Sequence, residues 1–342
     1  EPELARRLAD TQGAIIMKLG RTFPKVRSAL AQAGRLEHAM YVERASMPEQ
    51  RWLPVAEVDA ETVPYFSLIV VPGDSVAAVP GGRRGPSPVV KGAHVSGDRA
   101  AELLVVGLGP GPEDWLTPEV TAALAEVEHV VGYAPYVDRV PQRAGLTRHA
   151  SGNTVEVDRA RSALDLALAG ERVAVISGGD AGVFGMAAAV FEAAEDPAYA
   201  SVPIRVLPGI SAVQAVAARA GAPIGGDFAV LSLSDRLKPW PVIERRLRAI
   251  AEADLVLAIY NPASRSRTTQ VAEAQKLLLE VRSADTPVVV GRDVGRAEES
   301  LTLTTLAGLE AGTIDMKCLL IIGASSTRTT ASGRVWTPRS VD

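Results

Sequence analysis

The stretch LLVVGLGPGPEDWLTPEV, residues 103–120, predicts how most of this chain folds. It opens with an apolar run of the length of a buried strand, and the glycine- and proline-rich segment GLGPGP follows. Thr117 can then cap a helix that carries Pro118 at its first position. A strand that passes through such a turn into a helix is typical of α/β folds with a parallel sheet.

Two further apolar runs show the same pattern. Residues 172–176 lead into SGGDAGVFGM, residues 204–207 lead into LPGISA, and a helical pattern follows each turn. With another apolar run at residues 129–131, these segments predict an open, mainly parallel sheet. Loops at the carboxyl ends of parallel strands are where open sheets bind ligands. We therefore expect the three turns to form part of a binding site.

A second region follows the segment GAPIGGD, residues 221–227, which we interpret as a hinge. The expected strands of this region are residues 228–233, 255–260, 287–291, 300–306 and 319–323, and the expected helices are residues 242–251 and 269–281. The last strands have connections too short for helices, so the sheet is predicted to be mixed.

The beginning of the chain repeats this second region. AIIMKLG corresponds to LVLAIYNP, AMYVERAS to TPVVVGRDV, and YFSLIVVPG to LLIIGAS, in the same order. We therefore predict that residues 1–73 are the carboxyl-terminal half of a similar domain, without the front half and without its own glycine-rich loops. Residues 74–100 are predicted to be an exposed linker, and residues 101–342 a second domain with subdomains 101–222 and 223–342.

Composition argues against several classes of function. The net charge is −4, which argues against a general nucleic-acid binder. Cys318 is the only cysteine and the four histidines show no ligand spacing, so we expect no disulfide within the chain and no metal site. A single thiol fits a reducing cytoplasm. The sequence contains no uninterrupted apolar stretch of the roughly 18 to 20 residues that span a bilayer, so no membrane segment is expected.

GLGPG could be mistaken for the dinucleotide-binding pattern G-x-G-x-x-G. The third glycine of that pattern would fall on Pro112, and no acidic residue ends the next strand at Tyr133, so that interpretation fails. The glycines let backbone approach a ligand closely, although a simple tight turn would need them too.

The other turns leave two interpretations open. Asp180 can accept hydrogen bonds from a polar ligand, with apolar contact from Phe184 and Met186, or it can cap a helix while the other two belong to the core. Ser211 is better explained as a helix cap than as a nucleophile, since no acid or histidine is placed to form a triad. Asn261, in YNP, is an ordinary turn former that would face the first region's loops.

Basic residues gather in the second region, mostly on faces expected to be solvated: Arg236, Lys238, Arg245, Arg246, Arg265, Arg267, Arg292 and Arg296. Those near strand ends can bind carboxylates in bidentate fashion.

Taken together, GLGPG, SGGDAGVFGM, LPGISAVQA, LSLSDRLKPW, YNP and GRDVGR, in this order and spacing, resemble the corrin and porphyrin (tetrapyrrole) methylase family over about residues 101–339. SLSDRLKPWPVIERRL and YNPASRSR favour the members that methylate precorrin-3B at C17. Residues 1–73 resemble the carboxyl half of the members that methylate precorrin-2 at C20. The resemblance implies two αβα subdomains with an active-site cleft between them, and usually a homodimer.

The resemblance also implies a site for S-adenosylmethionine and a tetrapyrrole. The positions that match the family's cofactor loops are Pro110, Gly179, Asp180, Phe184, Ile210, Ser211, Ala212, Tyr260 and Asn261. The positions expected to flank the tetrapyrrole or to hold its carboxylates are Gly107, Gly109, Gly111, Arg236 and Arg292. Many relatives carry proline where this chain has Ala181, which puts the rigidity of that loop in question.

Methyl transfer from a sulfonium is an in-line displacement, so the protein mainly aligns the donor with a ring carbon and excludes water. The implied reaction also contracts the ring to give precorrin-4, which calls for a proton donor. Candidates are Ser232, Ser234, Asp235 and Lys238. The alternatives are an rRNA ribose or diphthamide-pathway methylase of the same fold, against which the acidic net charge counts, and a non-catalytic ligand sensor.

Overall fold

The computed structural model describes residues 2–10, 13–45, 47, 49–72, 100–152, 155–236, 238–264 and 267–340. The chain divides into two compact units, Glu1–Ala93 and His94–Asp342, which are described separately. The predicted linker lies outside the described residues, except for Ala100. Among the helices of the described residues, none is both long enough and apolar enough to cross a bilayer.

The first unit is a small antiparallel sheet with two helices. Its elements are α1 (Pro2–Asp10), β1 (Ala14–Met17), α2 (Phe23–Gln32), β2 (Met40–Glu43), β3 (Arg51–Pro54) and β4 (Ser67–Val71). The strand order is β1-β4-β2-β3. Phe23 and Leu30 of α2 pack against Tyr41 and Ile69 of the sheet, and all four side chains are buried. Apolar residues at helical spacing on α2 therefore meet alternating apolar residues of the strands.

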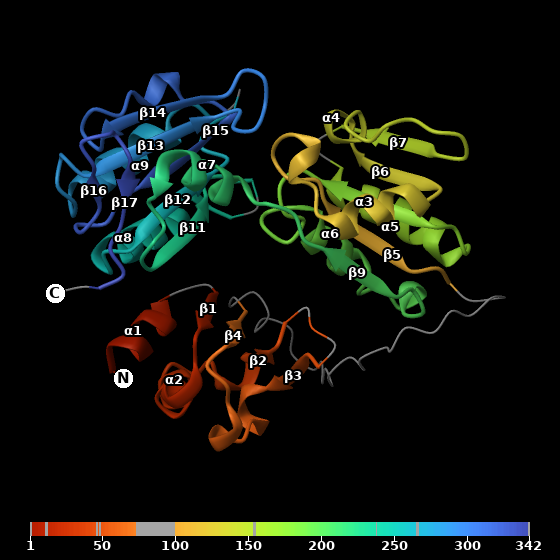
Figure 1. The fold of residues 1–342 in the computed structure, drawn as a ribbon, viewed down its shortest axis with the longest axis horizontal. Coiled ribbons are helices and arrows are strands. Elements are labelled where there is room, and N and C mark those ends of the chain that lie inside the picture. Colours follow the sequence, from red (N-terminus) through yellow and green to blue (C-terminus); the bar gives the residue numbers. More distant parts are fainter. Residues whose placement is uncertain are drawn as a thin grey trace. The chain divides into compact units, whose positions relative to one another are not determined.

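The second unit begins with a parallel sheet covered by helices (Figure 1). We call this sheet and its helices the first lobe. Its strands are β5 (Leu103–Gly107), β6 (His129–Tyr133), β7 (Thr147–Ser151), β8 (Val173–Ser177) and β9 (Ile204–Leu207), in the order β7-β6-β8-β5-β9. Helices α5 (Glu156–Leu168) and α6 (Met186–Ala193) pack on one face, and α3 (Pro118–Glu126) and α4 (Ala134–Val137) pack on the other. Both faces are covered, which is why the inner strands β5 and β8 are buried along their whole length.

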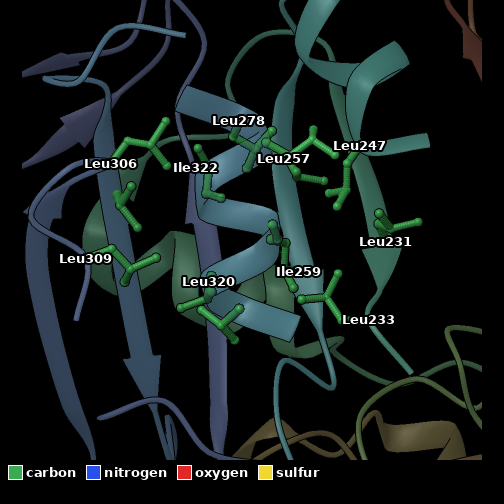
Figure 2. Close-up of a cluster of buried hydrophobic side chains, with 14 of the residues drawn as sticks. Leu231, Leu233, Leu247, Leu257, Ile259, Leu278, Leu306, Leu309, Leu320 and Ile322 are labelled. Atoms are coloured by element: carbon green, nitrogen blue, oxygen red, sulfur yellow. The ribbon is translucent and has the colours of Figure 1, made fainter. Parts of the chain in front are cut away.

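The second lobe is built on a mixed sheet. Its strands are β11 (Phe228–Ser232), β12 (Val256–Tyr260), β13 (Pro287–Arg292), β14 (Ser300–Thr305) and β15 (Cys318–Ile322), in the order β11-β12-β15-β13-β14. Helices α8 (Trp240–Glu252) and α9 (Gln270–Leu279) cover one face, where Figure 2 shows leucines such as Leu247 and Leu278 packed on Leu257 and Ile259. The predicted α/β class, with one parallel and one mixed sheet, is confirmed.

Helix α7 (Ala212–Ala220) covers the other face of this second sheet. It follows β9 of the first lobe directly, yet Val213 and Val216 pack against residues of β12, β13 and β15. Each lobe is consequently a three-layer αβα sandwich. Helix α7 follows the last strand of the first lobe in the sequence, but it packs on the sheet of the second lobe.

The segment interpreted as a hinge is held by the end of the chain. Gly221 and Ala222 form β10 (Gly221–Ala222), which pairs in parallel with β17 (Val335–Trp336). β16 (Arg328–Thr329) completes this small sheet. The Thr337 amide and hydroxyl donate to the carbonyls of Ala222 and Pro223 at 3.1 and 2.6 Å. The segment predicted to be a hinge is therefore held in place by these bonds. The structure also differs from the sequence prediction in strand β7, which was not predicted.

The two units share an arrangement of strands. The order β1-β4-β2-β3 of the first unit has the same antiparallel pairing as β12-β15-β13-β14 of the second. Helix α1 also packs with α2 as α8 packs with α9. The assignment of residues 1–73 to one half of a methylase domain stays a prediction.

Candidate functional site

Three glycine-rich turns lie side by side at the carboxyl ends of the parallel strands, because β8, β5 and β9 are neighbours. The amides of Gly109 and Gly179 each donate to the other residue's carbonyl at 3.0 Å. A Cβ on Gly107 would lie 2.7 Å from the Gly209 nitrogen, and a Cβ on Gly209 would lie 2.4 Å from the Gly179 oxygen. The turns are therefore in backbone contact that any side chain at these positions would disrupt.

Asp180 ties two of these turns together. Its Oδ1 accepts a hydrogen bond from the Gly182 amide at 2.8 Å, and its Oδ2 accepts one from the Gly209 amide at 3.0 Å. A carboxylate with two amide donors is a strong local restraint. Both interpretations from sequence gave this side chain an acceptor role, and in the structure it accepts from one backbone amide of its own turn and one of the next turn.

Arg139, which sequence reasoning missed, holds the GLGPG turn through its backbone carbonyls. Its guanidinium donates to the carbonyl oxygens of Leu108, Gly109 and Gly111 at 2.7 to 2.8 Å. Burial lowers the pKa of this guanidinium, with a further contribution from Arg296. The Leu108 and Gly109 amides donate to the Ser177 and Gly179 carbonyls at 2.9 and 3.0 Å, so the turn is held through both its carbonyls and its amides.

The second lobe meets these turns through Tyr260, at the end of β12. The Val213 amide, in the first turn of α7, donates to the Tyr260 hydroxyl at 3.0 Å. The Tyr260 ring lies 5.3 Å from the ring of Phe184, which is 52% exposed and has a left-handed backbone with φ of 53°. Burial raises the pKa of the Tyr260 phenol. Both α7 and the β8–α6 turn are thus brought to the end of β12.

Ser211 is a helix cap. The Gln214 side-chain oxygen accepts from the Ser211 amide and from its hydroxyl, both at 3.0 Å. The serine is 5% exposed, so the cap interpretation holds and no nucleophile is presented. Its neighbours Ile210 and Ala212 are partly buried against the core between α7 and the second sheet.

Asn261 has a left-handed backbone with φ of 48° and is fixed on both sides. Its side-chain amide donates to the Ser232 hydroxyl at 3.0 Å. Its carbonyl accepts from Arg267 at 3.0 Å, and the same guanidinium nitrogen donates to the Leu233 carbonyl at 3.0 Å. Arg267 is 7% exposed, so it supports the ends of β11 and β12 as Arg139 supports GLGPG.

GLGPG also touches the GRDVGR loop of the second lobe. A Cβ on Gly111 would lie 2.5 Å from the Gly295 Cα, so the two backbones pack directly. The Arg296 Nε donates to the Pro110 carbonyl at 3.2 Å. Gly111 is therefore part of a contact between the lobes, which the sequence did not reveal.

Several predicted site residues have protein partners. Arg292 pairs with Asp315, Nη2 to Oδ2 at 2.6 Å. Asp235 accepts from Gln270 at 3.1 Å and lies 3.7 Å from Arg267. The Ser234 amide donates to the Ser232 hydroxyl at 3.2 Å.

The remaining candidates differ in accessibility. Arg236 is exposed, and Arg265 lies outside the described residues. Met186 is in the core, where its sulfur faces the buried Arg159. Lys238 is half-buried, with Nζ 5.9 Å from the centroid of the Phe184 ring.

Tyr136 is a further residue that sequence reasoning missed. A Cβ on Gly178 would lie 2.6 Å from the Tyr136 ring, so this ring packs directly on the SGGD turn. It lies in α4, directly after β6, whose carboxyl end is next to that of β8. The motif GYAPY at a strand end was the signal that could have found it.

Comparison with known proteins gives the family. Residues 102–310 match the Tetrapyrrole (Corrin/Porphyrin) Methylases. The cobalamin biosynthesis protein CobIJ of Mycobacterium tuberculosis is 51% identical over 98% of this chain and 64% of its own length. The precorrin-3B C(17)-methyltransferase of a Sinorhizobium species is 49% identical over 66% of this chain and 90% of its own length.

A solved structure supports the same conclusion. The crystal structure of the methyltransferase CobJ aligns with a TM-score of 0.68 and 46% identity, and the match covers 70% of this chain and all of that one. The chain spans about two thirds of the length of the CobIJ relatives, 64%. These matches confirm the resemblance drawn from the loop motifs: the chain belongs to the tetrapyrrole (corrin/porphyrin) methylase family.

Proposed function

We propose that residues 101–342 methylate precorrin-3B at C17, with ring contraction to precorrin-4, and use S-adenosylmethionine as the methyl donor. The observation that carries this proposal is the meeting of turns from both lobes around Phe184 and Tyr260. The C17-methyltransferase names of several relatives support the choice of substrate.

The residues present fit the cofactor. A Cβ on Gly179 would meet no atom closer than 3.9 Å among the described residues, so this glycine leaves open backbone in the same turn as the half-exposed Phe184 ring, which suits a ligand held by backbone and one apolar face. The positions that would hold it are Gly179, Phe184 and the turn of Ser211. When bound, the cofactor supplies an electrophilic methyl group on sulfur. The backbone contacts and the carboxylate of Asp180 keep the turns in one geometry, which is what an in-line displacement requires.

The tetrapyrrole is a polyanion, and the chain offers cations near the same turns. Gly109 and Gly111 would flank the macrocycle, and Arg236 is exposed and available to its carboxylates. Arg292 is already paired with Asp315, so it would have to exchange that partner. Of the proton-donor candidates, Asp235 and Ser232 are engaged in hydrogen bonds that support the loops. They serve to orient neighbouring residues.

We also propose that the protein is a cytoplasmic homodimer, as the family resemblance implies.

In the first unit, β1 lies at the edge of its sheet and exposes Ile15 and Met17 by 68% and 63%. In the second unit the corresponding strand, β12, is paired with β11 and covered by α7. This supports the proposal that residues 1–73 are half of a precorrin-2 C20-methyltransferase-like domain whose other half would be their partner.

The direct test is methyl transfer. The purified chain is incubated with precorrin-3B and methyl-¹³C-labelled S-adenosylmethionine, and the product is analysed by mass spectrometry and ¹³C NMR. We expect one labelled methyl group at C17. The Sinorhizobium precorrin-3B C(17)-methyltransferase is the positive control. The proposal is refuted if that enzyme labels the tetrapyrrole and this chain does not. Light scattering of the same sample gives the mass of the assembly.

A further inference from the structure

Lys238 occupies a particular place between the lobes. It lies in the segment that joins β11 to α8, one residue before the Pro239 cap of that helix. Its Nζ lies over the ring of Phe184, which belongs to the β8–α6 turn of the first lobe. The Tyr260 ring lies 5.3 Å from the same phenylalanine. The ammonium group is therefore at the point where loops of both lobes meet.

This ammonium group lacks a carboxylate partner among the residues that the structure describes. Two acids of the adjoining loops have other partners: Asp180 accepts from backbone amides, and Asp235 accepts from Gln270 beside Arg267. Burial, and then the charge of Arg246, lowers the pKa of Lys238. A half-buried cation without a counter-charge costs free energy, and such groups gather at binding sites.

We propose that Lys238 binds a carboxylate of the macrocyclic substrate, above the ring of Phe184. This inference rests on the proposed function, in which the substrate carries several carboxylates. The cofactor also carries a carboxylate, but its sulfonium and ammonium groups make it a net cation. The positive charge of Lys238 therefore favours the polyanion over the cofactor.

The test compares Lys238→Met with Lys276→Met, which removes the same charge from the exposed surface of α9. We expect Lys238→Met to raise the KM for precorrin-3B about tenfold, the effect of one charge-assisted hydrogen bond, with kcat little changed. The Kd of S-adenosylhomocysteine, measured by calorimetry, should stay as in the unchanged protein. Lys238→Arg should restore most of the lost affinity, and Lys276→Met should have no effect.

The pH profile gives a second readout that a structural role would not move. Because its pKa is lowered, Lys238 loses its proton at a lower pH than an ordinary lysine, and the attraction for a carboxylate is lost with it. We expect kcat/KM to fall on this alkaline limb in the unchanged protein and to stay level over the same range in Lys238→Arg.

Two results would overturn the inference: an unchanged KM in Lys238→Met, or a weakened Kd for S-adenosylhomocysteine with an unchanged KM, which would assign the contact to the cofactor. Failure of the unchanged protein to methylate any precorrin is a different result, since it would refute the proposed function itself.

Discussion

At the scale of single residues, Asp180 shows how a site can depend on a side chain that contacts only backbone. Its two oxygens join Gly182 of one turn to Gly209 of the next. Arg139 and Arg267 act in the same way from below, through the carbonyls of GLGPG and of the strand ends at Leu233 and Asn261. These three charged side chains therefore help to hold the turns and the strand ends in place.

We predict that Asp180→Ala weakens binding of S-adenosylhomocysteine about tenfold or more, because two amides lose their acceptor and the turns lose their common restraint. Isothermal calorimetry measures the affinity. Asp196→Ala is the matched control, since Asp196 accepts from the Ala198 amide at 3.0 Å in an exposed turn away from the site. Equal affinity in both variants would show that Asp180 does not shape the cofactor loops.

At the scale of elements, the decisive feature is the adjacency of β8, β5 and β9 and the contact among their turns. We predict that Gly209→Ala destabilises the protein by about 1 to 3 kcal/mol, because its Cβ would overlap the Gly179 and Gly107 oxygens at 2.4 and 2.6 Å. Denaturant unfolding measures the change.

The same substitution at Gly152 is the control, because none of the described residues places an atom within 4 Å of a Cβ there. If Gly209→Ala were as stable as Gly152→Ala, the close packing of the three turns would be contradicted.

The sequence predicted the parts of this arrangement that have a local signal. Apolar runs followed by glycine-bearing turns predicted β5, β8 and β9, and the repeat predicted the strands of the first unit but not α1. β7 was missed because TRHAS, residues 147–151, is polar and only partly buried at the edge of its sheet. Arg139 was missed because it lies about thirty residues from the carbonyls it binds, and only the fold brings them together.

At the scale of the whole second unit, the GRDVGR loop connects the two lobes. Glu299 accepts from the Gly295 amide at 2.7 Å and pairs with Arg219 of α7 at 2.6 Å. The Arg219 guanidinium lies 5.0 Å from the ring of Trp115, which follows GLGPG. Arg219 first, and then the Gly295 amide, lowers the pKa of Glu299. The charge of this carboxylate therefore stabilises the junction.

We predict that Glu299→Gln lowers the free energy of unfolding by about 1 kcal/mol at pH 7, a few degrees in Tm. Because the folded-state pKa is lowered, the contribution is present above the ordinary glutamate pKa and is lost as pH falls through the folded value. Calorimetry at pH 7 and at acidic pH measures this, with exposed Glu298→Gln as control. A difference between the variants that persisted unchanged in acid would contradict an electrostatic origin.

Helix α7 is attached to one sheet by the chain and to the other by its apolar face, where Val213 and Val216 meet β12, β13 and β15. Loss of the first lobe would pull this helix away and leave Val256, Ala258 and Ile321 open to water. Loss of the second would leave the same helix without the surface that holds it. We therefore expect the two lobes to unfold in one cooperative event.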